Sequence, residues 1–117
     1  MPNPVTWFEV VGRDGPALRS FYSTLFGWKL EELPEMNYAM ADTGGAIGGG
    51  IGQTDDGSGH VTFYVEVDDP QAYLDRAEAL GGSTVMPVTE LPMVTLALFT
   101  DPEGHLIGIV KARPAEG

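Results

Sequence analysis

The chain has 117 residues, of which 43% are hydrophobic, and six Lys and Arg oppose 17 Asp and Glu to give a formal net charge of -11. This length predicts a single domain, residues 1–117, and the negative charge disfavours contact with phosphate backbones and anionic lipids, so we expect no nucleic-acid partner. The absence of cysteine excludes disulfides and thiolate chemistry. No apolar run approaches the ~20 residues of a membrane span, and no secretory signal is visible, so we expect no membrane attachment and a cytoplasmic location.

A strand and a helix are expected at the start of the chain. Residues 5–11 alternate, which places Trp7 and Glu9 on one face of a strand. Asp14 suits the N-cap of the following helix, and Gly27 ends it. Apolar residues recur at helical spacing along this segment: Leu18, Phe21, Tyr22 and Leu25. Three of its aromatic side chains are expected in the core: Phe21, Tyr22 and Phe26.

Three short strands are expected next, over residues 28–33, 37–41 and 46–51. The last of them contains AIGGGI, whose glycines indicate a bulge or the close approach of another backbone or a ligand. A phosphate loop is not expected, because no Gly-Lys-Ser/Thr and no helix pattern follow. The polar, glycine-rich residues 53–60 predict a linker halfway along the chain.

The second half begins with the stretch VTFYVEVDDPQAYLDRAEALGG at residues 61–82, which predicts a strand followed by a helix. Alternation places Thr62, Tyr64 and Glu66 on one strand face, and the apolar set Phe63, Val65 and Val67 beneath the helix. Asp69 is expected to cap this helix. Its buried stripe is expected to consist of Tyr73, Ala77 and Leu80.

Strands are expected at residues 84–88, 94–100 and 105–111, with a tight turn at residues 101–104. Each half therefore has the order βαβββ. The sequence predicts an α+β fold built from a duplicated unit, with module 1 at about residues 1–52, the linker at 53–60 and module 2 at about 61–117.

Four features carry a resemblance to a known family: the strand before the first helix and the segments FYSTLFGW, VEVDDPQAYLDRAEALGG and FTDPEGHLIGIV. In combination they resemble the vicinal oxygen chelate superfamily, which includes glyoxalase I, extradiol dioxygenases and bleomycin-resistance proteins. The resemblance implies two βαβββ modules whose sheets curl around a cleft. It also implies a homodimer, with modules paired within or across chains.

Metal enzymes of this superfamily place a His or Glu ligand on the first and last strands of each module. The matching positions here are Trp7, Gly48, Thr62 and Gly108. None of these residues offers the imidazole or carboxylate that such metals need, so we expect no family-type metal site and no cofactor. His60 in the linker and His105 at a turn are expected to be solvated.

The resemblance instead indicates a cleft lined with aromatic, methionine and glycine residues. We expect Trp7 and Tyr64 to stack on a ligand, because aromatic faces hold planar rings. Methionines at the cleft mouths adapt to irregular shapes, and the glycines would leave room for the ligand. The candidate ligand-binding residues are Trp7, Glu9, Tyr38, Met40, Gly48, Gly49, Thr62, Tyr64, Glu66, Met93 and Gly108.

Two of these candidates have further interpretations. Glu9 and Glu66 occupy equivalent strands and could form a carboxylate pair for acid-base work, or each could be hydrated or paired with Arg at a strand end. Trp7 could equally fill space or pack at a dimer interface.

The resemblance favours a metal-free binding protein of the antibiotic-resistance branch, which sequesters a flat, apolar, polycyclic or cationic ligand. One alternative is a glyoxalase-like lyase, isomerase or dioxygenase acting on a small carbonyl or dioxygenated substrate. Another is a structural or regulatory dimer without a ligand.

Overall fold

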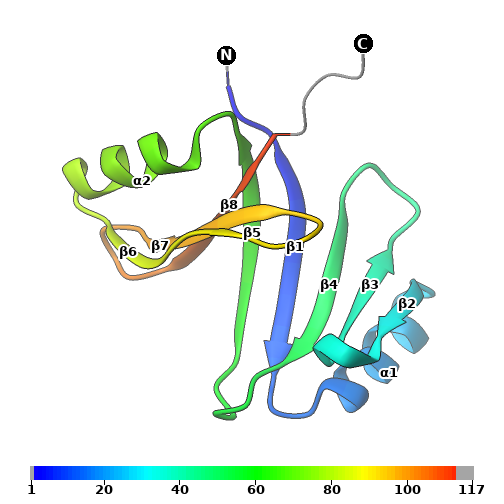
Figure 1. The fold of residues 1–117 in the computed structure, drawn as a ribbon. Coiled ribbons are helices and arrows are strands. Elements are labelled where there is room, and N and C mark those ends of the chain that lie inside the picture. Colours follow the sequence, from blue (N-terminus) through cyan, green and yellow to red (C-terminus); the bar gives the residue numbers. More distant parts are fainter. Residues whose placement is uncertain (1, 113–117) are drawn as a thin grey trace. The chain divides into compact units, whose positions relative to one another are not determined.

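The computed structural model describes residues 2–112, in which two repeats of the same element order follow one another (Figure 1). The first repeat comprises β1 (Val5–Gly12), α1 (Gly15–Phe26), β2 (Lys29–Leu33), a 3-10 turn η1 (Pro34–Met36), β3 (Tyr38–Asp42) and β4 (Gly48–Gln53). The second comprises β5 (His60–Val67), α2 (Pro70–Ala79), β6 (Ser83–Glu90), β7 (Thr95–Thr100) and β8 (Leu106–Lys111). The predicted α+β class and the βαβββ order are confirmed.

The described residues form two compact units. Residues 6–63 make up the first unit, and residues 2–5 together with 64–112 make up the second. Strand β5 contributes its first residues to one unit and its remainder to the other. The connection between β4 and β5 runs over residues 54–59, within the segment predicted as a linker.

The sheet of the first unit has the strand order β2-β3-β4-β1. Strands β1 and β4 are parallel. The pairs β4–β3 and β3–β2 are antiparallel. One register row joins four residues across the sheet: Glu31, Met40, Gly50 and Glu9. Residues in one register row project to the same face, so this row defines a face of the sheet.

Helix α1 covers the opposite face of this sheet, where it packs on β4 and β2. The ring of Phe8 lies 5.2 Å from that of Trp28, and Trp28 stacks on Tyr22 of α1 at 5.8 Å. Since Phe8 points toward α1, its neighbours Trp7 and Glu9 point away from the helix. The predicted ends of α1 are confirmed: Asp14 Oδ1 accepts a hydrogen bond from Ala17 N at 3.0 Å, and Gly27 adopts φ +72°.

The expected burial of the aromatic residues of α1 is wrong in part. Phe21 and Phe26 are 57% and 56% exposed, and Leu25 is 58% exposed. The helix contacts the sheet through a narrower stripe of more buried residues: Gly15, Leu18, Arg19 and Tyr22. Spacing of three and four residues fits both sets, so only the packing shows which stripe faces inward.

The sheet of the second unit has the order β5-β8-β7-β6, with β5 and β8 parallel. Its core consists of Val67, Leu74, Ala97 and Ile109, which lie together where α2 packs on the strands. Asp69 caps α2 as expected, with Oδ1 accepting from Ala72 N at 3.3 Å. The turn after β7 is also confirmed, since Gly104 adopts φ +91° and its N–H donates to Asp101 O at 2.9 Å.

Two burial predictions for this half of the chain are wrong. Leu80 is 76% exposed, and Leu74, at 2% exposure, fills the core position of α2 instead. Phe63 is 41% exposed, because the core under α2 takes only the later residues of its strand face, Val65 and Val67.

Candidate functional site

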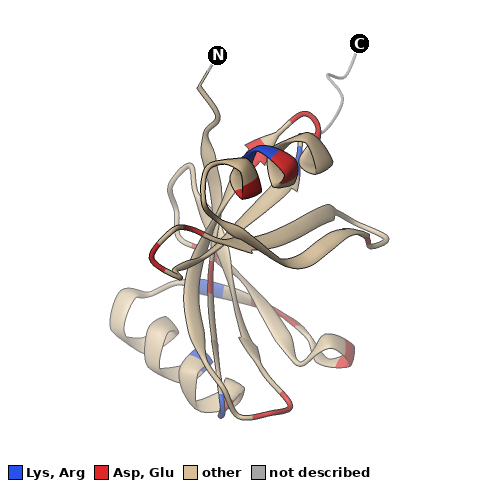
Figure 2. Cartoon of the chain, turned by 90° about the vertical axis from the view of Figure 1, so that its left-hand side faces the viewer, with Lys and Arg blue, Asp and Glu red and all other residues tan. Residues whose placement is uncertain are grey.

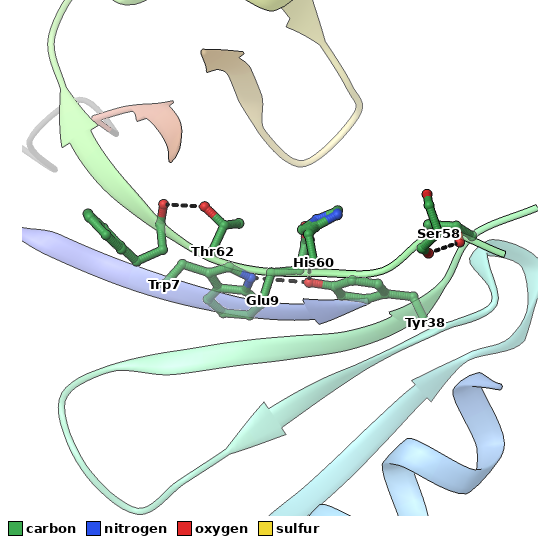
Figure 3. Close-up of polar contacts among 8 residues, drawn as sticks. Trp7, Glu9, Tyr38, Ser58, His60 and Thr62 are labelled. Atoms are coloured by element: carbon green, nitrogen blue, oxygen red, sulfur yellow. Dashed lines mark hydrogen bonds and ion pairs between the residues drawn. The ribbon is translucent and has the colours of Figure 1, made fainter. Parts of the chain in front are cut away.

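A series of hydrogen bonds links four side chains on the face of the first unit's sheet that lies opposite α1 (Figure 3). Trp7 Nε1 donates to the Tyr38 hydroxyl at 3.1 Å, and that hydroxyl donates to Glu9 Oε2 at 3.1 Å. The second carboxylate oxygen of Glu9 lies 3.4 Å from His60 Nε2. All four side chains are partly buried, so these hydrogen bonds hold the indole, the phenol and the carboxylate in fixed orientations.

Glycines of β4 make this arrangement sterically possible. Gly48 and Gly50 pair in register with Trp7 and Glu9, so they lie on the same face of the sheet, opposite α1. A Cβ on Gly50 would overlap with the Tyr38 ring and hydroxyl, and one on Gly52 would lie 2.7 Å from the ring. Tyr38 therefore lies flat over two glycines, while a Cβ on Gly48 would be only 3.4 Å from the Trp7 indole.

The close approach predicted for the glycine-rich strand thus comes from the chain's own rings. Phe8 lies over Gly49 on the α1 side of the sheet, and in the second unit Tyr64 lies over Gly108. A side chain at either glycine would overlap with the ring. The expectation that Gly49 and Gly108 leave room for a ligand is therefore corrected, because aromatic side chains occupy that room.

A surface hollow of about 280 Å³ lies beside Trp7 in the first unit. It is lined by Trp7, Lys29, Leu30, Glu31, Met40, Ala41 and Asp42. Two of the predicted ligand-binding residues, Trp7 and Met40, are thus brought together at one opening. Two carboxylates against one ammonium group give this opening a net negative charge, which favours a cationic molecule.

The other predicted site residues are divided between the two units. Tyr38 and Glu9 join the hydrogen bonds that reach Trp7, and the Thr62 hydroxyl donates to Phe63 O at 3.4 Å. Four candidates belong to the second unit: Tyr64, Glu66, Met93 and Gly108. Tyr64 is 6% exposed, whereas Met93 is 65% exposed between β6 and β7.

The position of His60 differs from the one expected from the sequence. This residue begins β5, its side chain is only 28% exposed, and it faces Glu9, so the expectation of a solvated linker histidine is corrected. The partners of Glu9 include Tyr38 and His60, while Glu66 lies in the other unit. Lys29, Glu31 and Asp42 were also missed, although alternation along β2 and β3 could have placed them on the face of Met40.

His105 behaves as expected for a histidine at a turn. Its side chain is 70% exposed, and Nδ1 lies 3.0 Å from Asp101 Oδ2. The backbone N–H of His105, followed by its imidazole, lowers the pKa of the Asp101 carboxyl below its ordinary value. Acidic residues are spread over several loops and over α2, where Arg76 lies between Asp75 and Glu78 in the sequence (Figure 2).

The four positions that hold metal in related enzymes do not fit a divalent ion here. The indole of Trp7 is a donor only, the glycines at 48 and 108 have no side chain, and the Thr62 hydroxyl donates to a carbonyl. Within residues 2–112, no three His, Asp or Glu side chains gather into a group that could hold a metal ion.

The fold and the sequence together define the class of the protein. The sequence model of the glyoxalase-like domain family matches residues 9–110, so the chain belongs to that family, and the resemblance to the vicinal oxygen chelate superfamily is confirmed. The solved structure of a glyoxalase/bleomycin resistance protein/dioxygenase superfamily member from Vibrio splendidus has a TM-score of 0.67. The match covers 95% of this chain and all of that chain at 17% identity, which shows the fold alone.

Two curated relatives have more specific names. A Mycobacterium bovis protein provisionally named glyoxylase CFP32 is 28% identical, over 91% of this chain and 44% of that protein. The anthracycline biosynthesis protein DnrV of Streptomyces peucetius is 26% identical, over 99% of this chain and 50% of that protein. The chain thus spans about half the length of the curated relatives it matches. Neither helix described within residues 2–112 has the length and apolar character needed to cross a membrane.

Proposed function

We propose that the protein binds a small, flat, apolar or cationic molecule in the hollow beside Trp7 and acts by sequestering it. The observation that carries this proposal is an indole held in place at the edge of an opening, with its N–H already bound to Tyr38. A ring whose polar atom is satisfied within the protein can offer its face to a ligand without further ordering. Met40 adds a side chain that adapts to the ligand's outline.

The charge and size of the hollow restrict the ligand. Glu31 and Asp42 lie at the opening, and the whole chain carries -11, so a planar cation is favoured over a planar anion. A volume of about 280 Å³ is close to the lower end for ligand sites, so it suits one or two fused rings or one end of a larger ring system. A relative named for anthracycline biosynthesis supports this class, since anthracyclines are planar and polycyclic.

The chemistry of the side chains beside the hollow supports sequestration. The family's ligand positions offer no donors for a divalent metal, and the hydrogen bonds of Trp7 and Tyr38 satisfy groups rather than leave them reactive. A protein that only binds must match its ligand in amount and hold it with a low Kd. We therefore expect one bound ligand per site and an unchanged ligand on release.

The two tryptophans provide a matched pair for the test. Doxorubicin and the planar cation proflavine would be titrated while tryptophan emission is followed in the wild type, W7F and W28F. Trp28 lies on the α1 side, so we expect W28F to bind like the wild type and W7F to bind about 10-fold more weakly. Binding by W7F within twofold of the wild type, or no saturable change with either compound, would refute the proposed site.

A second candidate function is an acid-base enzyme acting on a small carbonyl compound. It is favoured by the contact of Glu9 with His60, because a carboxylate beside an imidazole can orient it as a proton acceptor. The relative named as a glyoxylase agrees with this class. Turnover of the hemithioacetal of methylglyoxal, with and without added divalent metals, would be compared between the wild type, E9Q and H60Q. Turnover that both substitutions abolish would favour the enzyme over the sequestering protein.

The homodimer implied by the resemblance also remains a proposal. The exposed Phe21, Leu25 and Phe26 of α1 support it, because large apolar side chains gathered on one surface often mark an interface. Light scattering of the eluting protein would measure its mass. A monomer at high concentration would refute this proposal and leave the ligand site unaffected.

A further inference from the structure

The second unit contains a hollow of its own, of about 320 Å³. It lies among α2, β5, β7, β8 and the N-terminal segment, and none of its lining residues belongs to the site proposed above. The lining consists of Asn3, Val65, Val67, Tyr73, Arg76, Ala77, Leu80, Gly82, Phe99, Pro102 and Ile109.

The lining of this hollow is largely apolar, and several of its side chains are partly exposed. Val65, Tyr73 and Phe99 pack against the core but remain partly exposed, and Leu80 at the end of α2 is 76% exposed. The stripe of Tyr73, Ala77 and Leu80, which helical periodicity predicts to be buried, therefore borders this hollow. A volume of about 320 Å³ lies within the range of small-molecule sites.

The charge of the lining is opposite to that of the chain. Arg76 is the one charged residue among the lining residues, whereas the chain as a whole carries -11. The guanidinium carbon of Arg76 lies 5.2 Å from the centroid of the Tyr73 ring. The Tyr73 hydroxyl in turn accepts a hydrogen bond from Asn3 Nδ2 at 3.1 Å, which holds the ring beneath the cation.

The acidic neighbours of Arg76 on α2 have other partners. Asp75 accepts a hydrogen bond from Gln71 Nε2 at 3.0 Å, and Glu78 accepts one from the Thr84 hydroxyl at 2.6 Å. The residues three and four positions from Arg76 are Ala72, Tyr73, Ala79 and Leu80, so α2 supplies no ion-pair partner at helical spacing. Among residues 2–112, the ion pairs involve Arg19, His60 and His105, and Arg76 takes part in none of them.

We propose that this hollow is a second binding site, for a small hydrophobic carboxylate. The alkyl or aryl part lies against Val65, Phe99 and Ile109, and the carboxylate pairs with Arg76 at the rim. Planar guanidinium groups bind carboxylates through two hydrogen bonds, and a cation stacked on an aromatic ring is already ordered for this contact. The site selects against cations, whereas the hollow beside Trp7 selects for them.

Three probes of equal chain length separate the contributions of charge and apolar contact. Octanoate, octanol and octylamine would be titrated by calorimetry, with amide chemical shifts recorded to locate the binding. We expect saturable binding of octanoate, binding of octanol weaker by about 10-fold, and no measurable binding of octylamine. The shift changes should gather on α2 and β8.

Two substitutions test the site in different ways. R76Q removes the charge at the rim, so it should weaken the binding of octanoate by about 10-fold and leave the binding of octanol unchanged. A77L fills the hollow and should weaken both compounds, and W7F serves as the control that leaves octanoate binding unchanged. Circular dichroism melts of each variant confirm that the fold is retained.

Several results would overturn the proposal. They are the absence of saturable octanoate binding, equal binding of octanoate and octylamine, and unchanged octanoate affinity in R76Q. Because Trp7 lies in the other unit, a failure of the proposed drug-binding site would appear as a loss of doxorubicin binding alone. The two proposals can therefore fail separately.

Discussion

Adding one methyl group at Gly50 tests the packing on which the candidate site depends. A Cβ at this position would overlap with the ring and hydroxyl of Tyr38, so G50A must push that side chain away from β4. The displaced hydroxyl loses its contacts with Trp7 Nε1 and Glu9 Oε2, both of which are 3.1 Å long. The indole then loses the contact that orients it beside the hollow.

The expected cost of G50A is about 3 kcal/mol. A neutral hydrogen bond contributes about 1 kcal/mol and one to a carboxylate about 1.5–3 kcal/mol, with the lower values appropriate for these partly exposed groups. Overpacking adds about 1–3 kcal/mol, although the shift of the ring relieves part of it. For a chain of 117 residues, this loss lowers Tm by about 10 °C.

Urea unfolding followed by circular dichroism measures this cost, and tryptophan emission reports the change around Trp7. The matched control is G45A, because the nearest atom to a Cβ at Gly45 is 4.0 Å away, and its free energy of unfolding should change by less than about 0.5 kcal/mol. In a Y38A background the clash is absent, so G50A should there cost less than about 1 kcal/mol. Equal stability of G50A and G45A in the wild-type background would show that Tyr38 does not lie over β4.

Four further substitutions test the fold and one of its turns. L74A should lower the free energy of unfolding by about 2–5 kcal/mol because Leu74 is 2% exposed. Leu80 is 76% exposed, so L80A should lower it by less than about 0.5 kcal/mol. Similar losses for both variants in urea unfolding would contradict the packing of α2. D14A removes the acceptor for Ala17 N and should cost about 1 kcal/mol, with a loss of helical signal, and an unchanged melt would argue against the cap. The pKa of Asp101 is lowered in the folded state, so D101N should be less stable than the wild type at pH values above the ordinary Asp pKa of 3.8. This difference in stability should disappear as the pH falls through the lowered pKa. A stability difference that did not depend on pH would refute this explanation.

On the two proposals, the first and second units carry hollows that favour ligands of opposite charge. The hollow beside Trp7 is bordered by Glu31 and Asp42, whereas the hollow beside Tyr73 is bordered by Arg76. Each hollow is also lined by an aromatic residue whose polar group is hydrogen-bonded, Trp7 to Tyr38 and Tyr73 to Asn3. On these two proposals, the charge at the rim of each hollow sets which ligand it favours.

The local signals of the sequence determined the order and the ends of the elements. Asp14 and Asp69 cap their helices because a short carboxylate reaches the first free N–H groups, and this depends on residues three positions apart. Gly27 ends α1 because it adopts a positive φ at low cost. The same signals, repeated in both halves, indicated a duplicated unit, and the resemblance of segments such as FYSTLFGW and FTDPEGHLIGIV indicated the superfamily.

Only the tertiary structure decided which residues form the candidate site. Tyr38 meets Trp7 and Glu9 across 31 and 29 residues of sequence, and His60 meets Glu9 across 51, so no local pattern could bring them together. Likewise, periodicity allowed two stripes on α1, and the contact with the sheet chose the one that contains Tyr22 rather than Phe21. Glycines at 48 and 50 were visible in the sequence, but only the register of β1, β3 and β4 showed that aromatic side chains lie over them.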